Sequence, residues 1–231
     1  MEKDVVYILR EGENEELRHS LRSLKNLPHR KIVFVGGKPE GLEPDIWIPF
    51  NQIKDKWGNA RDLIELMCKD NRLTKEVYLF NDDFFVMKPV NTIPVYTNGD
   101  LRQFARFVTR NGQRESEYIT TRINPTIKEL QSRGLPTVNY ELHLPICISR
   151  EKMLKIFRLF PRFVASRSTY GNYYHLRGER ISLNFHDGSV QSPKDKLNPS
   201  RIFISTTDES WQGVVGEQIK ELFPNPSKYE L

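Results

Sequence analysis

The fold of this chain is predicted from residues 77–85, Val77-Tyr78-Leu79-Phe80-Asn81-Asp82-Asp83-Phe84-Phe85, in which an apolar run leads into two adjacent carboxylates. A short apolar run bounded by turn residues is typical of a buried strand in an α/β sheet. Ligands of such sheets bind at the carboxyl ends of the strands. Paired carboxylates suit Mg²⁺ or Mn²⁺, and such an ion can hold a diphosphate. The stretch therefore predicts Asp82 and Asp83 as metal ligands, with a plain polar turn as the alternative.

The residues before this strand predict a βαβ unit. Residues 4–9 and 31–35 are apolar and suit core strands, and the helix between them is expected to be capped by Asn14. Gly36-Gly37 ends the second strand, and residues 45–49 suit a short third strand. A strand, helix and strand within about 35 residues favour parallel pairing. We therefore expect an α/β fold with a Rossmann-like, mostly parallel central sheet flanked by helices.

A further helix is predicted to lead into the strand at 77–80. Asn59 is a suitable N-cap for this helix, and Asp62 then falls at its third position. That spacing matches a capping box, although Asp is shorter than the usual Glu. A purely structural role is therefore the main alternative to any chemical role of Asp62.

The rest of the chain predicts mainly helices. Helices are expected over 100–110, 124–134, 150–160 and 211–222, and a late strand is expected over 201–205. Residues 166–175 fit no simple period, and residues 189–200 suit a surface loop. The helix at 100–110 carries an arginine every four residues on one face, namely Arg102, Arg106 and Arg110.

Length and composition indicate one globular domain over residues 1–231, with a nucleotide- and metal-binding half at 1–90 and an acceptor-side half at 91–231. The amino terminus lacks a signal-peptide pattern, and no apolar run approaches the roughly 18–20 residues of a membrane span. We therefore expect a cytoplasmic protein without a membrane span. Cys68 and Cys147 lie in apolar stretches and are expected to be buried thiols rather than a disulfide.

The net charge of +5 is unevenly distributed along the chain. Residues 101–180 hold 15 basic and 6 acidic side chains, a balance of +9. This excess predicts a surface for a polyanion or a phosphorylated substrate, with a solvated basic face as the alternative. We expect this part to form a helical, basic insertion after the Asn-Asp-Asp strand.

Several blocks of the sequence resemble the Stealth family. The resemblance lies in Asp4-Val5-Val6-Tyr7, in residues 16–24 (Glu-Leu-Arg-His-Ser-Leu-Arg-Ser-Leu), in residues 30–35, in Gly58-Asn59-Ala60-Arg61-Asp62, in residues 78–85, and in His143 with Pro145. Arg167 and Asn172 suggest a fourth block. Stealth proteins are similar to GT-A-like nucleotide-sugar enzymes and transfer a hexose-1-phosphate from a nucleotide sugar to an acceptor hydroxyl.

The resemblance implies a role for each candidate residue. The donor would be a nucleotide sugar held by Mg²⁺ or Mn²⁺ at Asp82 and Asp83, with Asp83 also counted as catalytic. Asp62 or His143 would accept the proton of the attacking hydroxyl. The remaining substrate-binding candidates are Arg18, Arg22, Asn59, Arg167 and Asn172. The acceptor-binding candidates come instead from the basic excess of residues 101–180 and from four-residue spacing, and they are Arg102, Arg106 and Arg110.

Other interpretations stay open at this point. The same fold and metal suit a glycosyltransferase that releases a nucleoside diphosphate, and its acceptor can be a glycan, DNA or another polyanion. A third interpretation is a nucleic-acid-binding protein without chemistry, although paired carboxylates repel phosphates unless a metal intervenes. His143 can be a buried structural histidine, and Arg18 and Arg22 can belong to a solvated helix face.

Overall fold

The structure is a computed structural model, and it describes residues 2–110, 116–160, 165–181, 189–190, 196–198 and 200–231. Its backbone divides into two compact units. The first unit comprises Met1–Ile93, His143–Arg150 and Phe185–Leu231, and the second comprises Pro94–Leu142 and Glu151–Asn184. The unit that contains Asp82 and Asp83 thus also contains His143 and the carboxy-terminal segment. The expectation of one domain with halves divided at residue 90 stays a prediction.

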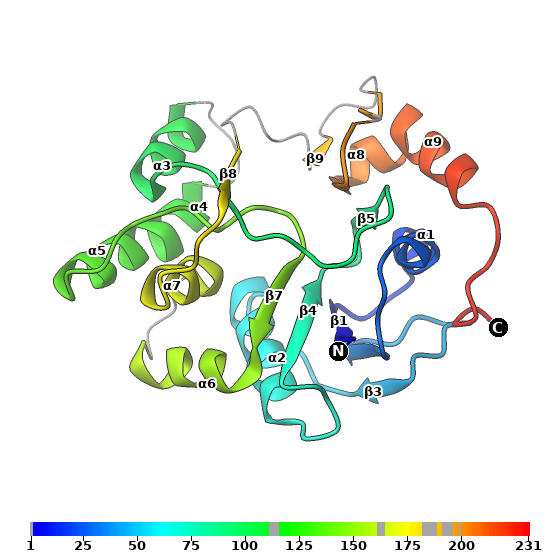
Figure 1. The fold of residues 1–231 in the computed structure, drawn as a ribbon, viewed down its shortest axis with the longest axis horizontal. Helices are drawn as coiled ribbons and strands as arrows, with labels where there is room; N and C mark the ends of the chain where they lie inside the picture. The colour runs from blue at the N-terminus through cyan, green and yellow to red at the C-terminus, as the bar shows by residue number, and fades with distance from the viewer. Residues whose placement is uncertain (1, 111–115, 161–164, 182–188, 191–195, 199) are drawn as a thin grey trace. The chain divides into compact units, whose positions relative to one another are not determined.

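The first unit contains a central sheet of five strands (Figure 1). Its strands are β1 (Asp4–Leu9), β2 (Ile32–Gly36), β3 (Ile46–Ile48), β4 (Glu76–Phe80) and β7 (Ile146–Ser149). The order is β3-β2-β1-β4-β7, and every pair is parallel except β4 with β7. The mixed α/β fold and the mostly parallel central sheet are confirmed.

Helices flank this sheet, and a second small sheet completes the first unit. The helices are α1 (Glu15–Ser23), the 3₁₀ turn η1 (Leu24–Asn26), α2 (Lys56–Lys69), α8 (Asp208–Trp211) and α9 (Val214–Leu222). The second sheet has the order β5-β10-β9, with β5 (Phe84–Val86), β10 (Phe203–Thr206) and β9 (Ser189–Val190). Strands β1, β2 and β4 are buried almost along their whole length, which is typical of parallel strands covered on both faces.

The second unit is mainly helical. Its helices are α3 (Leu101–Arg110), α4 (Ser116–Tyr118), the π-helical turn η2 (Ile119–Ile123), α5 (Asn124–Ser132), α6 (Arg150–Leu159, whose first residue belongs to the first unit) and α7 (Ser166–Tyr173). Strands β6 (Tyr96–Thr97) and β8 (Glu179–Arg180) pair in parallel. The core of this unit joins Leu101, Ile119, Ile123, Ile127 and Leu130.

Two local predictions were wrong, and one helix was not predicted. Helix α2 begins at Lys56 and is capped by Asp55, whose side chain accepts the backbone N–H groups of Trp57 and Gly58, so Asn59 lies inside the helix. Residues 166–173 form a helix although they show no apolar period. The expected helix at 211–222 is interrupted after Trp211, and α9 starts at Val214.

The two cysteines are free thiols, Cys68 buried and Cys147 half-buried. Among the described residues, no helix is both long and apolar enough to cross a membrane.

Candidate functional site

Asp82 and Asp83 lie at the carboxyl end of β4, in the short turn that leads into β5. The turn is held by backbone hydrogen bonds from Phe84 to Asn81 and from Thr206 to the Asp83 carbonyl. The Asp83 side chain is only 14% exposed. Its Oδ1 atom is buried and has no hydrogen-bond partner in the part of the chain that the structure describes. A buried carboxylate oxygen without a partner is unusual in proteins and calls for an explanation.

Other acidic groups share this edge of the sheet. Burial raises the pKa of Asp83 well above its usual value, and the neighbouring charges of Asp82 and Glu16 raise it further. Burial also raises the pKa of Glu16 to about 7, although its hydrogen bond from Thr206 Oγ1 opposes that shift. Like charges placed close together favour the protonated form. The edge of the sheet is therefore a place where a positive charge would be stabilised.

His143 adds an imidazole to these carboxylates. Its Nδ1 lies 3.5 Å from Asp83 Oδ2 and 3.1 Å from Ser205 Oγ. Its Nε2 lies 3.1 Å from Asn81 Nδ2, and its ring packs edge-on against Phe84. The side chain is 48% exposed, so His143 is not a buried structural histidine. An oriented and accessible imidazole beside a carboxylate is suited to proton transfer.

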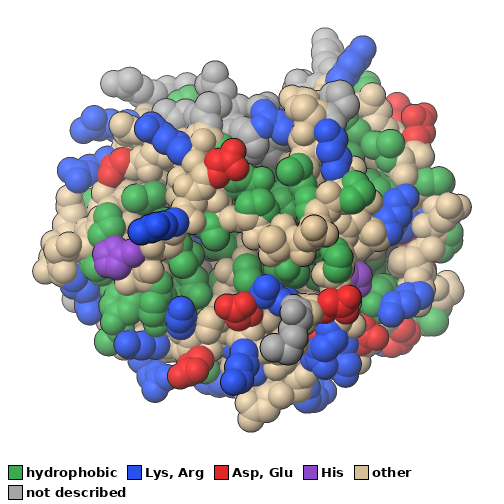
Figure 2. Space-filling model, viewed as in Figure 1, with side chains coloured by type: hydrophobic (Ala, Val, Ile, Leu, Met, Phe, Trp, Pro, Cys, Tyr) green, Lys and Arg blue, Asp and Glu red, His purple; other side chains and the backbone are tan. Residues whose placement is uncertain are grey.

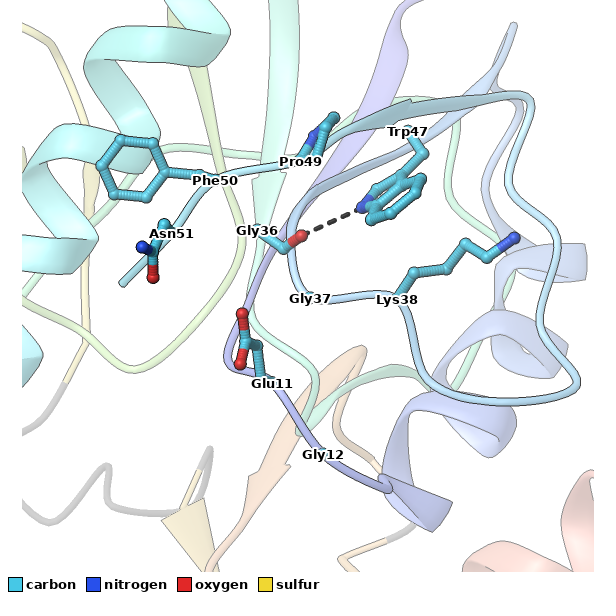
Figure 3. Close-up of a pocket in the computed structure, with 9 residues that line it drawn as sticks. All are labelled: Glu11, Gly12, Gly36, Gly37, Lys38, Trp47, Pro49, Phe50 and Asn51. Atoms are coloured by element: carbon cyan, nitrogen blue, oxygen red, sulfur yellow. Dashed lines mark hydrogen bonds between the residues drawn. The ribbon is translucent and has the colours of Figure 1, made fainter. Parts of the chain in front are cut away.

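A pocket of about 510 Å³ opens where β1, β2 and β3 end (Figure 3). The backbone of Gly36 and Gly37 lies in its centre. Trp47 and Lys38 lie on one side, and Phe50 and Asn51 lie on the other. A Cβ atom on Gly36 would come within 2.3 Å of the Leu9 carbonyl oxygen, so only glycine fits there. The Trp47 indole N–H donates to the Gly36 carbonyl oxygen at 2.9 Å, which fixes the half-exposed ring.

The structure gives Asn59 and Asp62 structural partners. The Asn59 amide accepts the backbone N–H of Lys54 and donates to its carbonyl oxygen, and it is buried. Asp62 forms a 2.6 Å ion pair with the Lys54 ammonium group. Both side chains therefore hold the segment before α2, and their roles in chemistry stay predictions.

Arg18 and Arg22 are also engaged with the protein. Arg18 donates to the carbonyl oxygens of Glu40 and Gly41. Arg22 forms a two-pronged ion pair with Glu230, at 2.8 and 2.6 Å. Their predicted role as phosphate ligands is untested, and these contacts favour a structural role over a solvated helix face.

The other candidates belong to the second unit. Arg167 donates to the carbonyl oxygen of Leu142, the residue before His143 in sequence. The buried Asn172 amide binds both the N–H and the carbonyl oxygen of Val138, which is a structural role. On α3, Arg102 and Arg106 are exposed, whereas the side chain of Arg110 lies outside the described residues.

Sequence reasoning missed three residues that bond to the two carboxylates or affect them by their charge. Glu16 lies on α1, Asn14 Nδ2 donates to Asp82 Oδ2 at 2.5 Å, and the charge of Lys56 lowers the pKa of Asp83. Asn14 was recognised only as the cap of α1, a role that is confirmed because its Oδ1 accepts the Leu17 N–H. The only available signal was position, since α1 directly follows a strand that ends at this edge of the sheet.

The carboxylates at this edge of the sheet suit a hard divalent cation under one condition. Within the described ranges, no three His, Cys, Asp or Glu side chains are placed so that they could hold a metal together. Mg²⁺ usually binds through one or two carboxylates and completes its shell with water and substrate phosphates. Asp82 and Asp83, with the unpartnered Oδ1 of Asp83, match that pattern provided that a phosphorylated substrate supplies the other ligands.

Comparison with known proteins gives no family assignment, because no family model and no curated protein matches this chain.

Proposed function

We propose that this chain is a transferase that uses a nucleotide-sugar donor, with Mg²⁺ or Mn²⁺ held by Asp82 and Asp83. The observation that carries the proposal is the unpartnered, buried Oδ1 of Asp83 in a group of like charges beside His143. A bound divalent cation would offset this repulsion and supply charge neutralisation at the phosphates. The resemblance to Stealth proteins supports the same function, and a GT-A-like fold is part of the proposal.

The glycine-lined pocket supports a nucleotide donor. Its backbone walls leave room for a ligand to approach closely, and the Trp47 and Phe50 rings offer apolar faces for a base. Lys38 lies at the rim, with its ammonium group 5.6 Å from the Trp47 ring centre and paired with the carboxylate of Glu43. In open α/β sheets a ligand in this position lies outside the carboxyl ends of the strands.

The proposed step is attack of an acceptor hydroxyl on the sugar-bearing phosphorus of the donor. The new bond joins the acceptor oxygen to that phosphorus, and the bond to the nucleoside monophosphate breaks. His143 accepts the hydroxyl proton at Nε2, the nitrogen that otherwise faces the half-buried Asn81 amide. Asp83, 3.5 Å from Nδ1, stabilises the imidazolium that forms. Attack at the anomeric carbon, with release of a nucleoside diphosphate, is the second candidate.

The second unit is proposed to serve the acceptor as a helical, basic insertion. Counted from the sequence, it holds 14 basic and 7 acidic side chains, a balance of +7, whereas the first unit has a balance of −2. Lys and Arg side chains are spread over the part of the surface where α3, α5 and α6 lie (Figure 2). Such charge favours an anionic acceptor, either a glycan or a nucleic acid.

Calorimetric titration of donor, with and without Mn²⁺, tests the metal site. We expect Asp82→Asn and Asp83→Asn each to abolish the effect of Mn²⁺ on donor affinity while the protein stays folded. Asp70→Asn is the matched control, because Asp70 lies at the carboxy-terminal end of α2 and is paired with Arg72. Unchanged Mn²⁺ dependence in both site variants would refute the metal assignment.

The nucleotide product then decides the bond that is made. Nucleoside monophosphate, with the donor's β-phosphorus retained on the sugar, supports sugar-phosphate transfer, whereas nucleoside diphosphate supports glycosyl transfer. Binding of nucleic acid without any donor binding or turnover over a panel of nucleotide sugars would instead favour a non-enzymatic binding protein.

A further inference from the structure

A second pocket, of about 300 Å³, lies in the first unit between the end of α1, the turn η1 and the segment that follows α9. It shares no lining residue with the glycine-lined pocket. Its apolar lining includes Leu21, Leu24 and Phe223, which are almost fully buried. The volume is at the lower end of the range of small-molecule sites, so it suits a compact ligand.

The ion pair of Arg22 and Glu230 fixes one wall of this pocket. Arg22 Nε and Nη2 donate to the two carboxylate oxygens, and Nη1 donates to the carbonyl oxygens of Phe223 and Pro224 at 3.2 Å. Glu230 also accepts the N–H and the hydroxyl of Ser227. The two side chains are only 15% and 6% exposed. Their charges therefore neutralise each other, and together they tie the carboxy-terminal segment to α1.

Two further cations of the lining have no such carboxylate. The Lys25 ammonium group lies 5.1 Å from the centre of the Phe223 ring, and that of Lys228 lies 4.9 Å from the Tyr229 ring centre. Among the described residues, neither lysine forms an ion pair. His29 adds a third basic side chain. The pocket thus combines an apolar floor with a positive rim whose two ammonium groups are positioned over its own aromatic rings.

We propose that this pocket binds a small organic anion, namely a phosphate monoester or carboxylate on a ring-sized apolar body. The ring would lie in the apolar part of the pocket, against Pro226 and the accessible edges of the buried floor, and the anionic group would lie between Lys25 and Lys228. Arg22 is already neutralised by Glu230, so the net charge that the ligand meets comes from the two lysines. This site is independent of the proposed transferase activity, since none of its binding groups lies in the turn that carries Asp82 and Asp83.

Three probes separate the two parts of the recognition. Phenyl phosphate carries both ring and charge, inorganic phosphate carries charge alone, and phenol carries a ring alone. Binding is measured by calorimetry in the absence of donor and divalent metal. We expect phenyl phosphate to bind more tightly than either of the others, with an affinity that falls as salt is added. Benzoate then tells whether a carboxylate serves as well as a phosphate.

The double variant Lys25→Gln/Lys228→Gln is expected to weaken phenyl phosphate binding about tenfold, as for the loss of two solvent-exposed ion pairs. Lys69→Gln is the matched control, because Lys69 is exposed on α2 and pairs with Glu65 outside this pocket. Melting temperatures of all variants show whether the fold is kept.

Equal affinity of phenol and phenyl phosphate, equal binding by the double variant, or no binding at millimolar concentration would each overturn the proposal. The Asp83→Asn variant is expected to keep its phenyl phosphate affinity, so failure at one site is distinguishable from failure at the other.

Discussion

Replacing Glu16 by Gln is expected to stabilise the protein at neutral and alkaline pH. Burial and the nearby charges of Asp82 and Asp208 raise the pKa of Glu16 to about 7. The folded state therefore holds a proton on Glu16 over a pH range in which the unfolded chain has released it. A glutamine keeps an oxygen that can accept the Thr206 hydroxyl, but it carries no charge to be repelled.

The size and sign of the effect follow from proton linkage. Below the ordinary pKa of 4.5, Glu16 is protonated in both the folded and the unfolded state, so its ionisation does not affect the free energy of unfolding. As pH rises from there to about 7, the folded state binds more protons than the unfolded state, so stability is lost. The full difference between the two pKa values of Glu16 corresponds to a loss of about 3 kcal/mol in the free energy of unfolding. For a chain of this size that is a rise of roughly 6–12 °C in melting temperature for Glu16→Gln at pH 8.

Denaturant unfolding at pH 4, 5.5, 7 and 8, in the presence of a chelator, measures this dependence. The difference between Glu16→Gln and the natural sequence should be small at pH 4 and grow to its full value by pH 8. Glu217→Gln, an exposed change on α9, is the control and should show no such trend. A Glu16→Gln protein that is equally or less stable at pH 8 would refute the reasoning.

Three further changes test other parts of the structure. His143→Ala should lower kcat about 10²–10⁴-fold with donor affinity kept, as for loss of a general base. An unchanged single-turnover rate constant would exclude that role. Replacing Arg102, Arg106 and Arg110 together by Gln should raise the KM for an anionic acceptor and flatten its salt dependence, whereas donor hydrolysis stays the same. Glu230→Gln should destabilise the protein by about 3 kcal/mol in denaturant unfolding, because it leaves the buried Arg22 charge without its partner, and a loss below 1 kcal/mol would contradict this.

The local parts of the fold were predictable because each depends on neighbouring residues. Continuous apolar runs such as Ile32–Gly36 indicate buried strands. Asn14 caps α1 by accepting the backbone N–H of Leu17, only three residues further along the chain. The start of α2 was misplaced because Asp55 and Asn59 are both good caps, and only the packing of the preceding loop selects between them. Helix α7 was missed because its buried face is largely polar and is held by side-chain hydrogen bonds rather than by an apolar stripe.

The sequence by itself determined the strand that ends in Asp82 and Asp83, because adjacent carboxylates after an apolar run are a local feature. It also fixed the uneven charge of the chain. Only the tertiary structure decided what surrounds the two carboxylates. Glu16 approaches from a helix some 66 residues earlier and His143 from a segment some 60 residues later, along paths set by strand order and helix packing. Apolar periodicity records which face of an element is buried but not which polar side chains meet at its end, so the sequence alone could not assemble this group.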